Sequence, residues 1–144
     1  MSQFVLDCSV TMSWCLIDET NSYADAVLNS FNSNAVEAIT PQLWSLEVTN
    51  VLLVAERRGR ITQAQTTRAV TLLQALPIVI DLQTVQRAMG DTLALGRSLR
   101  ISAYDAAYLE LAMREGLPLA TIDEQLANVA NSCGVQTYLS ATEV

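Results

Sequence analysis

Apolar and polar positions follow two patterns along the chain, short apolar runs and longer amphipathic stretches. The short runs predict strands, because a few consecutive apolar residues bounded by turn residues are typical of a buried parallel sheet. The longer stretches repeat their apolar positions every three or four residues, which predicts helices. The expected strands are 3–6, 37–40, 78–80, 117–121 and 135–139. The expected helices are 11–16, 21–31, 42–58, 62–75, 84–98, 102–116 and 123–131.

The order of these elements predicts the fold class. Strands alternate with helices and there are no hairpin signals, which is typical of an α/β fold whose parallel sheet is covered by helices on both faces. We expect a sheet of about five strands. The chain has 144 residues without an internal repeat or a linker-like segment, so we expect one domain, residues 1–144.

One helix-to-strand unit has especially clear boundaries. Ser102 and Asp105 have capping-box spacing, in which each side chain bonds the backbone N–H of the other. Gly116 stands where a left-handed C-cap belongs, and Pro118 prevents the helix from continuing. After a short apolar run, Asp123 begins the next helix. The carboxylates of Asp105 and Asp123 are therefore either helix caps or half of a metal site.

Two more acids occupy informative positions. Asp7 directly follows the first strand, and ligand sites in parallel sheets lie beyond the carboxyl ends of the strands; the alternative is an Asx turn. Glu47 lies on or beside the apolar stripe of a long helix, where a dry, unpaired charge is costly. It needs an arginine, a cation or a water-filled cleft, unless it reaches solvent at the edge of the stripe. If the first and fourth strands are neighbours, all four acids could meet in one crevice.

Composition excludes many kinds of chemistry. The chain has no histidine and no lysine, which rules out Ser-His-Asp and Cys-His catalysis, a P-loop lysine and a Schiff-base lysine. An enzyme built from this sequence works with carboxylates, hydroxyls and arginines. Carboxylates without imidazole or thiolate clusters suit a hard cation such as Mg²⁺ or Mn²⁺.

The expected location is the cytoplasm. The three cysteines have no metal-ligand spacing, which suits a reducing compartment. No apolar run approaches the roughly eighteen residues of a membrane helix. The N-terminus also lacks a basic, signal-like start, so we expect no membrane association.

Four segments, taken together and in order, resemble PIN-domain ribonucleases, in particular the VapC toxins of bacterial toxin–antitoxin pairs. They are FVLDCS (4–9), LWSLEVTNVL (43–52), ISAYDAAY (101–108) and LATIDEQL (119–126). The segment ERRGRI (56–61) also fits the usual end of the long helix in this family. The resemblance covers essentially the whole chain and implies a PIN-like fold with endoribonuclease activity.

The resemblance also implies a site and a set of partners. The acids would form a pocket for one or two Mg²⁺ or Mn²⁺ ions; they are Asp7, Glu47, Asp105 and Asp123. Ser9 and Thr121 would hydrogen-bond to these carboxylates or to metal-bound waters. The expected partners are the RNA substrate, a second copy of the chain in a homodimer, and a cognate antitoxin that blocks the pocket.

The N-terminal helices are the expected contact region for the antitoxin. Their aromatic residues are Trp14, Tyr23, Phe31 and Trp44. For each of these residues, ordinary core packing is the alternative role.

The net charge of −7 is a poor match to RNA, so we expect RNA contact to depend on local arginines. The candidates are Arg57, Arg58, Arg60, Arg97 and Arg100. For the first three, favourable placement at a helix C-terminus is the alternative explanation.

Other functional interpretations remain open. One is a housekeeping RNA-processing nuclease in place of a toxin, and another is an inactive PIN-like binding module. A third is an α/β domain whose acids are only caps and turns, with an unrelated small-molecule site.

Overall fold

The computed structural model describes residues 2–33 and 35–139. The strands are β1 (Ser2–Leu6), β2 (Val36–Thr40), β3 (Ile78–Ile80) and β4 (Leu119–Ala120). The helices are α1 (Cys8–Cys15), α2 (Ser22–Ser30), α3 (Leu43–Arg57), α4 (Gln63–Ala75), α5 (Thr84–Arg87), α6 (Leu93–Leu99), α7 (Ala103–Glu115) and α8 (Glu124–Ser132). A 3₁₀ turn (Ile17–Glu19) follows α1, and a π-helical turn (Ala88–Thr92) joins α5 to α6. None of the helices described is both long and apolar enough to cross a membrane.

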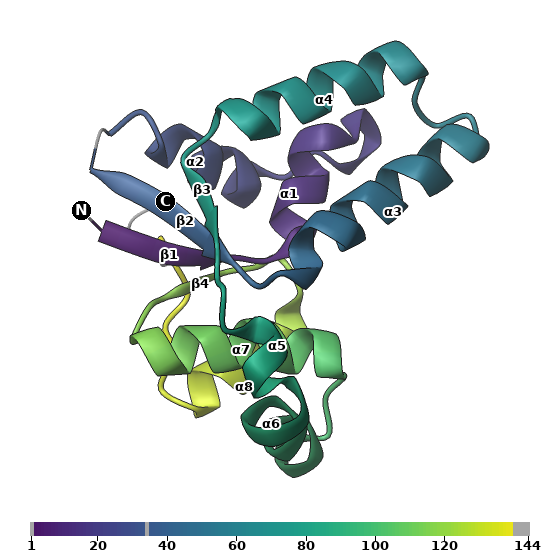
Figure 1. The fold of residues 1–144 in the computed structure, drawn as a ribbon. Coiled ribbons are helices and arrows are strands. Elements are labelled where there is room, and N and C mark those ends of the chain that lie inside the picture. Colours follow the sequence, from purple (N-terminus) through teal and green to yellow (C-terminus); the bar gives the residue numbers. More distant parts are fainter. Residues whose placement is uncertain (1, 34, 140–144) are drawn as a thin grey trace.

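The four strands form one parallel sheet in the order β3-β2-β1-β4 (Figure 1). The chain steps outward from β1 to β2 and β3, and then returns to the other side of β1 as β4. Val5 pairs with Leu119 and Leu6 pairs with Ala120, so β1 and β4 are neighbours. The strand order therefore reverses beside β1, which is where ligand sites of parallel sheets occur.

The predicted α/β class and parallel sheet are confirmed, but the predicted fifth strand at 135–139 is wrong. This segment forms one isolated parallel bridge, between Thr137 and Leu119. The N–H of Tyr138 donates to the carbonyl of Leu119 at 2.9 Å, and the chain then bends away. Leu139 has φ +51°, which is incompatible with extended pairing, and β4 itself is only two residues long.

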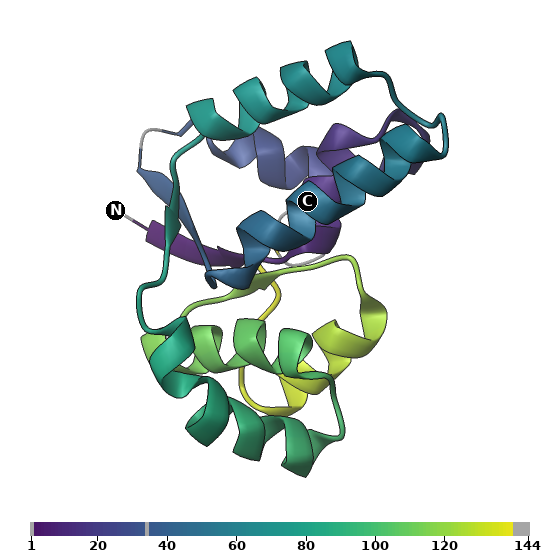
Figure 2. The ribbon, with the colours of Figure 1, turned by 45° about the vertical axis from the view of Figure 1, so that its right-hand side comes forward.

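Helices cover both faces of the sheet. In Figures 1 and 2, α1 to α4 lie above the sheet and α5 to α8 lie below it. Phe4, Val5 and Leu6 are fully buried between the two layers, as expected for the central strand of a parallel sheet. Below the sheet, α7 presents Tyr108, Leu109 and Leu111, which are also fully buried. Burying a large apolar side chain stabilises the fold by roughly 1.5–3 kcal/mol, so this central layer carries much of its stability.

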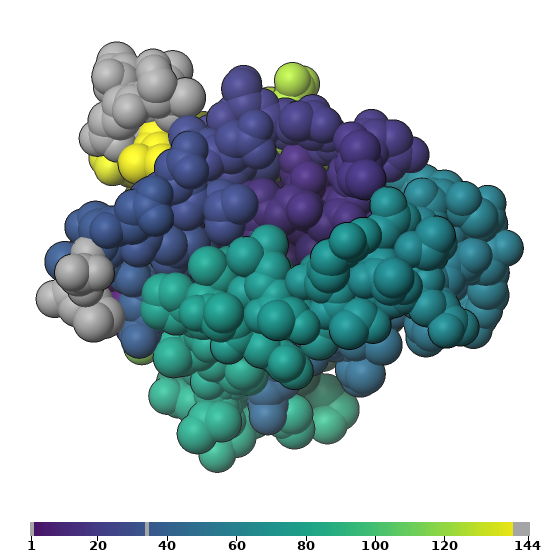
Figure 3. Space-filling view, turned by 90° about the horizontal axis from the view of Figure 1, so that it is seen from above, coloured from purple at the N-terminus to yellow at the C-terminus, as the bar shows by residue number. Residues whose placement is uncertain are grey.

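The aromatic residues of the upper layer pack in or against the core. Trp44 is buried, and its indole N–H donates to the Thr11 hydroxyl at 3.0 Å. Trp14, Tyr23 and Phe31 are half-buried and contact the core. Figure 3 looks down on this layer, in which α4 lies beside α1 and α2. These placements support core packing for all four aromatics.

Helix boundaries largely follow the predicted signals. Thr62 caps α4 through a complete capping box with Gln65. At the end of α7, Gly116 has φ +64°, the left-handed conformation predicted for it. The predicted helix 84–98 is interrupted by the π-helical turn, which contains Gly90, and glycine has a weak helix preference.

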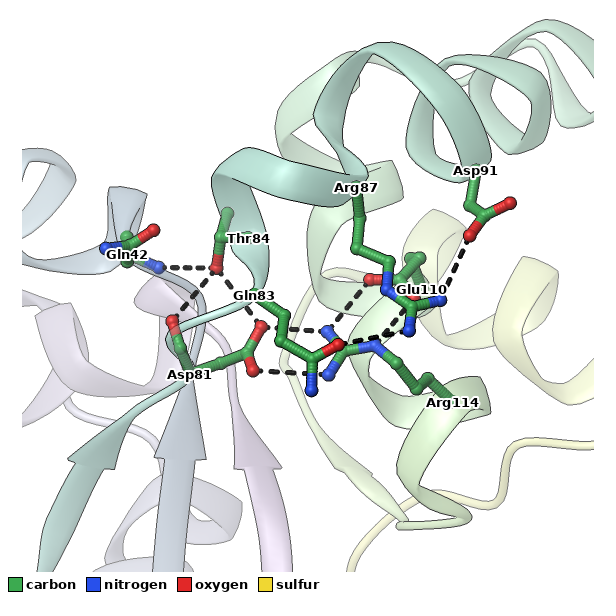
Figure 4. A network of polar contacts seen from close by, with 8 residues as sticks. All are labelled: Gln42, Asp81, Gln83, Thr84, Arg87, Asp91, Glu110 and Arg114. Atoms are coloured by element: carbon green, nitrogen blue, oxygen red, sulfur yellow. Dashed lines mark hydrogen bonds and ion pairs between the residues drawn. The ribbon is translucent and has the colours of Figure 1, made fainter.

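A buried ionic network, missed by the sequence analysis, ties the lower layer to the edge of the sheet (Figure 4). Arg114 of α7 donates two hydrogen bonds to Asp81, at 2.8 and 3.2 Å, and two to Glu110, at 2.9 and 3.0 Å. Thr84 donates to Asp81 at 3.2 Å and accepts the N–H of Gln42, just before α3, at 3.0 Å. The network therefore joins β3 and the start of α3 to α7. Burial acts to raise the pKa of Asp81, but the hydrogen bonds from Arg114, Gln83 and Thr84 and the positive charge of Arg114 together outweigh it, and the pKa is lowered.

We predict that Arg114→Met destabilises the protein by about 3–5 kcal/mol, because two buried carboxylates lose their cation. Urea unfolding monitored by circular dichroism measures the loss. Arg87→Met is the matched control, since the Arg87–Asp91 pair is largely exposed and its loss costs under about 1 kcal/mol. Equal, small losses in both variants would contradict a supporting role for the buried network.

Candidate active site

Asp7 lies at the carboxyl end of β1, directly beside β4. It occupies the N-cap position of α1, yet its side chain makes no capping hydrogen bond. Instead Oδ2 accepts from the hydroxyls of Ser9 at 2.6 Å and Thr121 at 2.8 Å. Asp7 is only 7% exposed, and burial raises its pKa, although these two hydroxyls act in the opposite direction. The side chain is therefore a fixed, largely desolvated carboxylate.

The loop after β4 is tied to the loop after β1. The Ser9 hydroxyl accepts the N–H of Ile122 at 3.2 Å, and the Thr121 hydroxyl accepts the N–H of Asp123 at 3.1 Å. Asp123 is exposed and caps α8, because its Oδ1 accepts the N–H of Leu126 at 3.2 Å. The structure therefore confirms that Asp123 caps α8, and the capping hydrogen bond uses one oxygen of its carboxylate.

Glu47 enters the site from α3 in the upper layer. It is half-buried, and its Oε1 accepts the hydroxyl of Tyr108, from α7 in the lower layer, at 2.5 Å. Burial raises the pKa of Glu47, and the nearby charges of Asp7 and Asp105 add to this effect against the opposing hydrogen bond. Within the described chain no arginine pairs with Glu47. Its half-buried carboxylate is stabilised instead by the hydrogen bond from the Tyr108 hydroxyl.

Asp105 enters from the first turn of α7 and is also half-buried. Its N–H donates to the Ser102 hydroxyl at 3.1 Å, as the capping spacing predicted. The reciprocal bond is absent, and across residues 2–33 and 35–139 the Asp105 carboxylate has no hydrogen-bond partner. Burial raises the pKa of Asp105 most, and the negative charges of Asp7 and Asp123 raise it further.

The four carboxylates lie close enough to influence one another electrostatically. The charge of Asp7 acts on Glu47 and Asp105, and the charge of Asp123 acts on Asp7 and Asp105. Among the residues described, no arginine forms an ion pair with any of the four acids. The pKa values of Asp7, Glu47 and Asp105 are raised, by burial first and by neighbouring negative charge second. Carboxylates in this state that lack a basic partner fit a hard divalent cation in their donor chemistry.

The site is not a preformed metal cage. In the described part of the chain, no three acidic or thiol side chains already stand at the spacing that one ion requires. A cation held by these residues would therefore require side chains to turn toward it. Asp105 is the carboxylate freest to do so, since no hydrogen bond holds it.

A cavity of about 430 Å³ adjoins Glu47 on α3. Its lining consists of Leu43, Leu46, Glu47, Asn50 and Tyr104. Leu46 is 75% exposed and Tyr104 is 63% exposed, so apolar and aromatic surface lies open beside Glu47 and Asp105.

The predicted RNA-contact arginines lie at or just beyond the ends of two helices. Arg57 and Arg58 end α3, while Arg97 and Arg100 lie at the end of α6, and all four are exposed. The ends of α3 and α6 lie on the same side of the molecule as the start of α7 (Figure 2). Arg60 differs from the others, because it forms ion pairs with Asp18 at 2.9 Å and Glu19 at 3.7 Å.

The sequence analysis included Tyr108 only as the last residue of the segment 101–108 and gave it no role in the site. The available signal was its hydroxyl, because a buried tyrosine usually needs a hydrogen-bond partner. Its partner, Glu47, is 61 positions away in the sequence, so only the fold identifies the pair.

The molecule has a parallel sheet whose strand order reverses beside β1, and acidic side chains lie at that edge. These features define a class of α/β proteins in which the ligand site lies beyond the carboxyl ends of the strands. Comparison with known families is more specific: the PIN domain model matches residues 4–132, and the chain belongs to the PIN domain family.

Two individual proteins are similar to the chain. Ribonuclease VapC3 of Pyrobaculum aerophilum is 28% identical over 125 residues, which cover 87% of this chain and 92% of that protein. The crystal structure of PAE2754 from Pyrobaculum aerophilum has a TM-score of 0.65 and 20% sequence identity, and the match covers 89% of this chain and 79% of that one. At this identity the second likeness shows the fold alone.

We predict that Asp105→Asn stabilises the metal-free protein at neutral pH. The pKa of Asp105 is raised in the folded state, so its stabilising contribution is present at low pH and is lost as pH rises through the folded pKa. Removing the charge should raise the Tm at pH 7 in EDTA by roughly 2–4 °C, the shift that about 1 kcal/mol produces in a domain of this size. The gain should disappear below pH 3.8, the ordinary pKa of this carboxyl.

Thermal unfolding at both pH values tests this prediction. Asp25→Asn is the matched control, because Asp25 is an exposed aspartate in the first turn of α2. That change should lower the Tm slightly through lost interaction with the helix dipole. A lower Tm for Asp105→Asn at pH 7 would contradict the electrostatic interpretation of the crevice.

Proposed function

We propose that the chain is a Mg²⁺- or Mn²⁺-dependent endoribonuclease that hydrolyses RNA phosphodiester bonds. The observation that carries this proposal is the convergence of four carboxylates without an arginine at the β1–β4 edge; they are Asp7, Glu47, Asp105 and Asp123. A relative named as a ribonuclease, matched over nearly its full length, supports RNA as the substrate. The match of the family model to residues 4–132 supports our proposal that residues 1–144 form one PIN domain.

The carboxylates would hold one or two cations through oxygens that no protein donor occupies. Ser9 and Thr121 hold Asp7 through Oδ2, which leaves Oδ1 for the cation. Asp105, which has no hydrogen-bond partner in the described chain, would turn toward the ion. When bound, the cation lowers the pKa of a water ligand and offsets negative charge on the phosphate and on the leaving 3′ oxygen. This chemistry requires neither of the residue types that the chain lacks, histidine and lysine.

The surface beside the acids suits single-stranded RNA. Tyr104 directly precedes Asp105 and is well exposed, so its ring is available to stack on a base next to the scissile phosphate. Asn50 lines the same cavity and offers a hydrogen-bond donor and an acceptor. The exposed arginines at the ends of α3 and α6 would contact flanking phosphates, which offsets the negative net charge of the chain locally.

We further propose that the protein is the toxin of a type II toxin–antitoxin pair, acts as a homodimer in the cytoplasm, and is neutralised by a cognate antitoxin. The sequence resemblance to VapC toxins supports this role. A housekeeping RNA-processing nuclease is the alternative, and an antitoxin gene next to that of this protein would distinguish the two.

We predict that the purified protein cleaves a mixed RNA pool in the presence of Mn²⁺ or Mg²⁺ and that EDTA abolishes cleavage. Asp7→Asn should lower the rate by more than about 100-fold, since loss of even an outer partner of a metal ligand can cost that much. Gel analysis of end-labelled RNA measures the rate, with Asp25→Asn as the remote control. RNA binding without cleavage in every condition would favour an inactive binding module.

We also predict that Arg97→Gln combined with Arg100→Gln weakens RNA binding and flattens its salt dependence. Each lost contact with a single-stranded phosphate should reduce the slope of log K against log salt concentration by about 0.7. Fluorescence anisotropy in EDTA measures binding without cleavage. Arg60→Gln is the control and should leave the slope unchanged, because Asp18 and Glu19 already occupy this guanidinium. An equal effect of both changes would contradict a specific role for the end of α6.

A further inference from the structure

Three of the four acids are held by a protein donor at one carboxylate oxygen. Asp7 is held at Oδ2 by two hydroxyls, and Asp123 is held at Oδ1 by the N–H of Leu126. Glu47 is held at Oε1 by the Tyr108 hydroxyl. Over the described residues, no side-chain hydrogen bond reaches the second oxygen of any of these carboxylates. One oxygen therefore fixes each side chain and the other stays available.

The donor to Glu47 is unusual among these three because it comes from the opposite layer. Glu47 stands on α3 above the sheet, whereas Tyr108 stands on α7 below it. The Tyr108 residue is 1% exposed, so its ring is locked in the core and its hydroxyl has a defined position. Burial raises the pKa of Tyr108, and the hydrogen bond to Glu47 raises it further, so the hydroxyl remains a proton donor at neutral pH.

Glu47 requires such an anchor more than the aspartates do. A glutamate has one more rotatable bond than an aspartate, and Glu47 is half-buried, with exposed surface on its side of the cleft. Without a hydrogen bond, its carboxylate would be free to turn away from the other acids and toward water. The Tyr108 hydroxyl holds Oε1 at the crevice and leaves Oε2 free.

We propose that Tyr108 is a positioning residue that orients the Glu47 carboxylate for binding a divalent cation. This inference rests on the proposed function and deepens it, since it assigns a role to a residue outside the acidic set. Tyr108 itself acts through Glu47 and has no contact with the ion.

The test compares the Mn²⁺ affinity of wild type, Tyr108→Phe and Tyr138→Phe by isothermal titration calorimetry. Tyr138→Phe is the matched control, because it also removes a partly buried hydroxyl, which donates to Ser30 at 2.9 Å and forms no hydrogen bond with any of the four acids. The Mn²⁺ Kd should rise about 10- to 100-fold in Tyr108→Phe and stay unchanged in Tyr138→Phe. Thermal unfolding in EDTA shows whether both variants fold, and both keep a near-isosteric ring.

A double-mutant cycle separates positioning from a general structural effect. In a Glu47→Gln background, Tyr108→Phe should cause no further loss of Mn²⁺ affinity, since the side chain that Tyr108 orients has lost its charge. Independent losses that simply multiply would overturn the proposal. An unchanged Mn²⁺ affinity in Tyr108→Phe would also overturn it.

The same experiment distinguishes failure of this inference from failure of the proposed function. If wild type binds Mn²⁺ and Tyr108→Phe binds it equally well, the positioning role is wrong and the metal site stands. If wild type binds no Mn²⁺, both the metal-dependent function and the role of Tyr108 are wrong.

Discussion

The electrostatic constraint in this structure is a set of buried and half-buried carboxylates that lack a basic partner. Burial and neighbouring charge raise the pKa values of Asp7, Glu47 and Asp105, so the folded chain keeps these groups at a cost to its own stability. The rest of the fold holds them in place. The sheet brings β1 beside β4, and helices from opposite layers contribute the remaining two acids. Such an arrangement is typical of functional sites, where a strained electrostatic environment persists because the surrounding structure fixes it.

A second buried acid at the same edge of the sheet is neutralised by an arginine. Asp81 follows β3 as Asp7 follows β1, and both side chains are 7% exposed. Asp81, however, receives two hydrogen bonds from Arg114, which also neutralises Glu110. Asp7 receives only hydroxyl groups. The chain therefore balances the acids that join its layers, and it leaves uncompensated the acids that face the cleft. This contrast distinguishes the carboxylates of the ionic network from those of the proposed metal site more clearly than burial does.

Much of the fold could be predicted because its signals are local. Alternating apolar runs and amphipathic stretches predicted the α/β class, and capping chemistry at Ser102 and Gly116 predicted helix ends that the structure confirms. The fifth strand could not be excluded in this way, because it is the left-handed backbone at Leu139 that stops the pairing. Pairing partners also lie far apart in sequence, so the single bridge from Thr137 to Leu119 depends on how the sheet closes.

The sequence by itself determined the chemical repertoire: carboxylates, hydroxyls and arginines, with acids after strands and at helix starts. It could not determine which groups meet, because charge compensation depends on distances between segments that only the folded chain brings together. The tertiary structure decided that Arg114 pairs with Asp81 and that Arg60 pairs with Asp18. It likewise decided that Tyr108, below the sheet, donates a hydrogen bond to Glu47, above it. It also decided that Asp123 is both a helix cap and a member of the acidic crevice, since one carboxylate has two oxygens and can serve both roles.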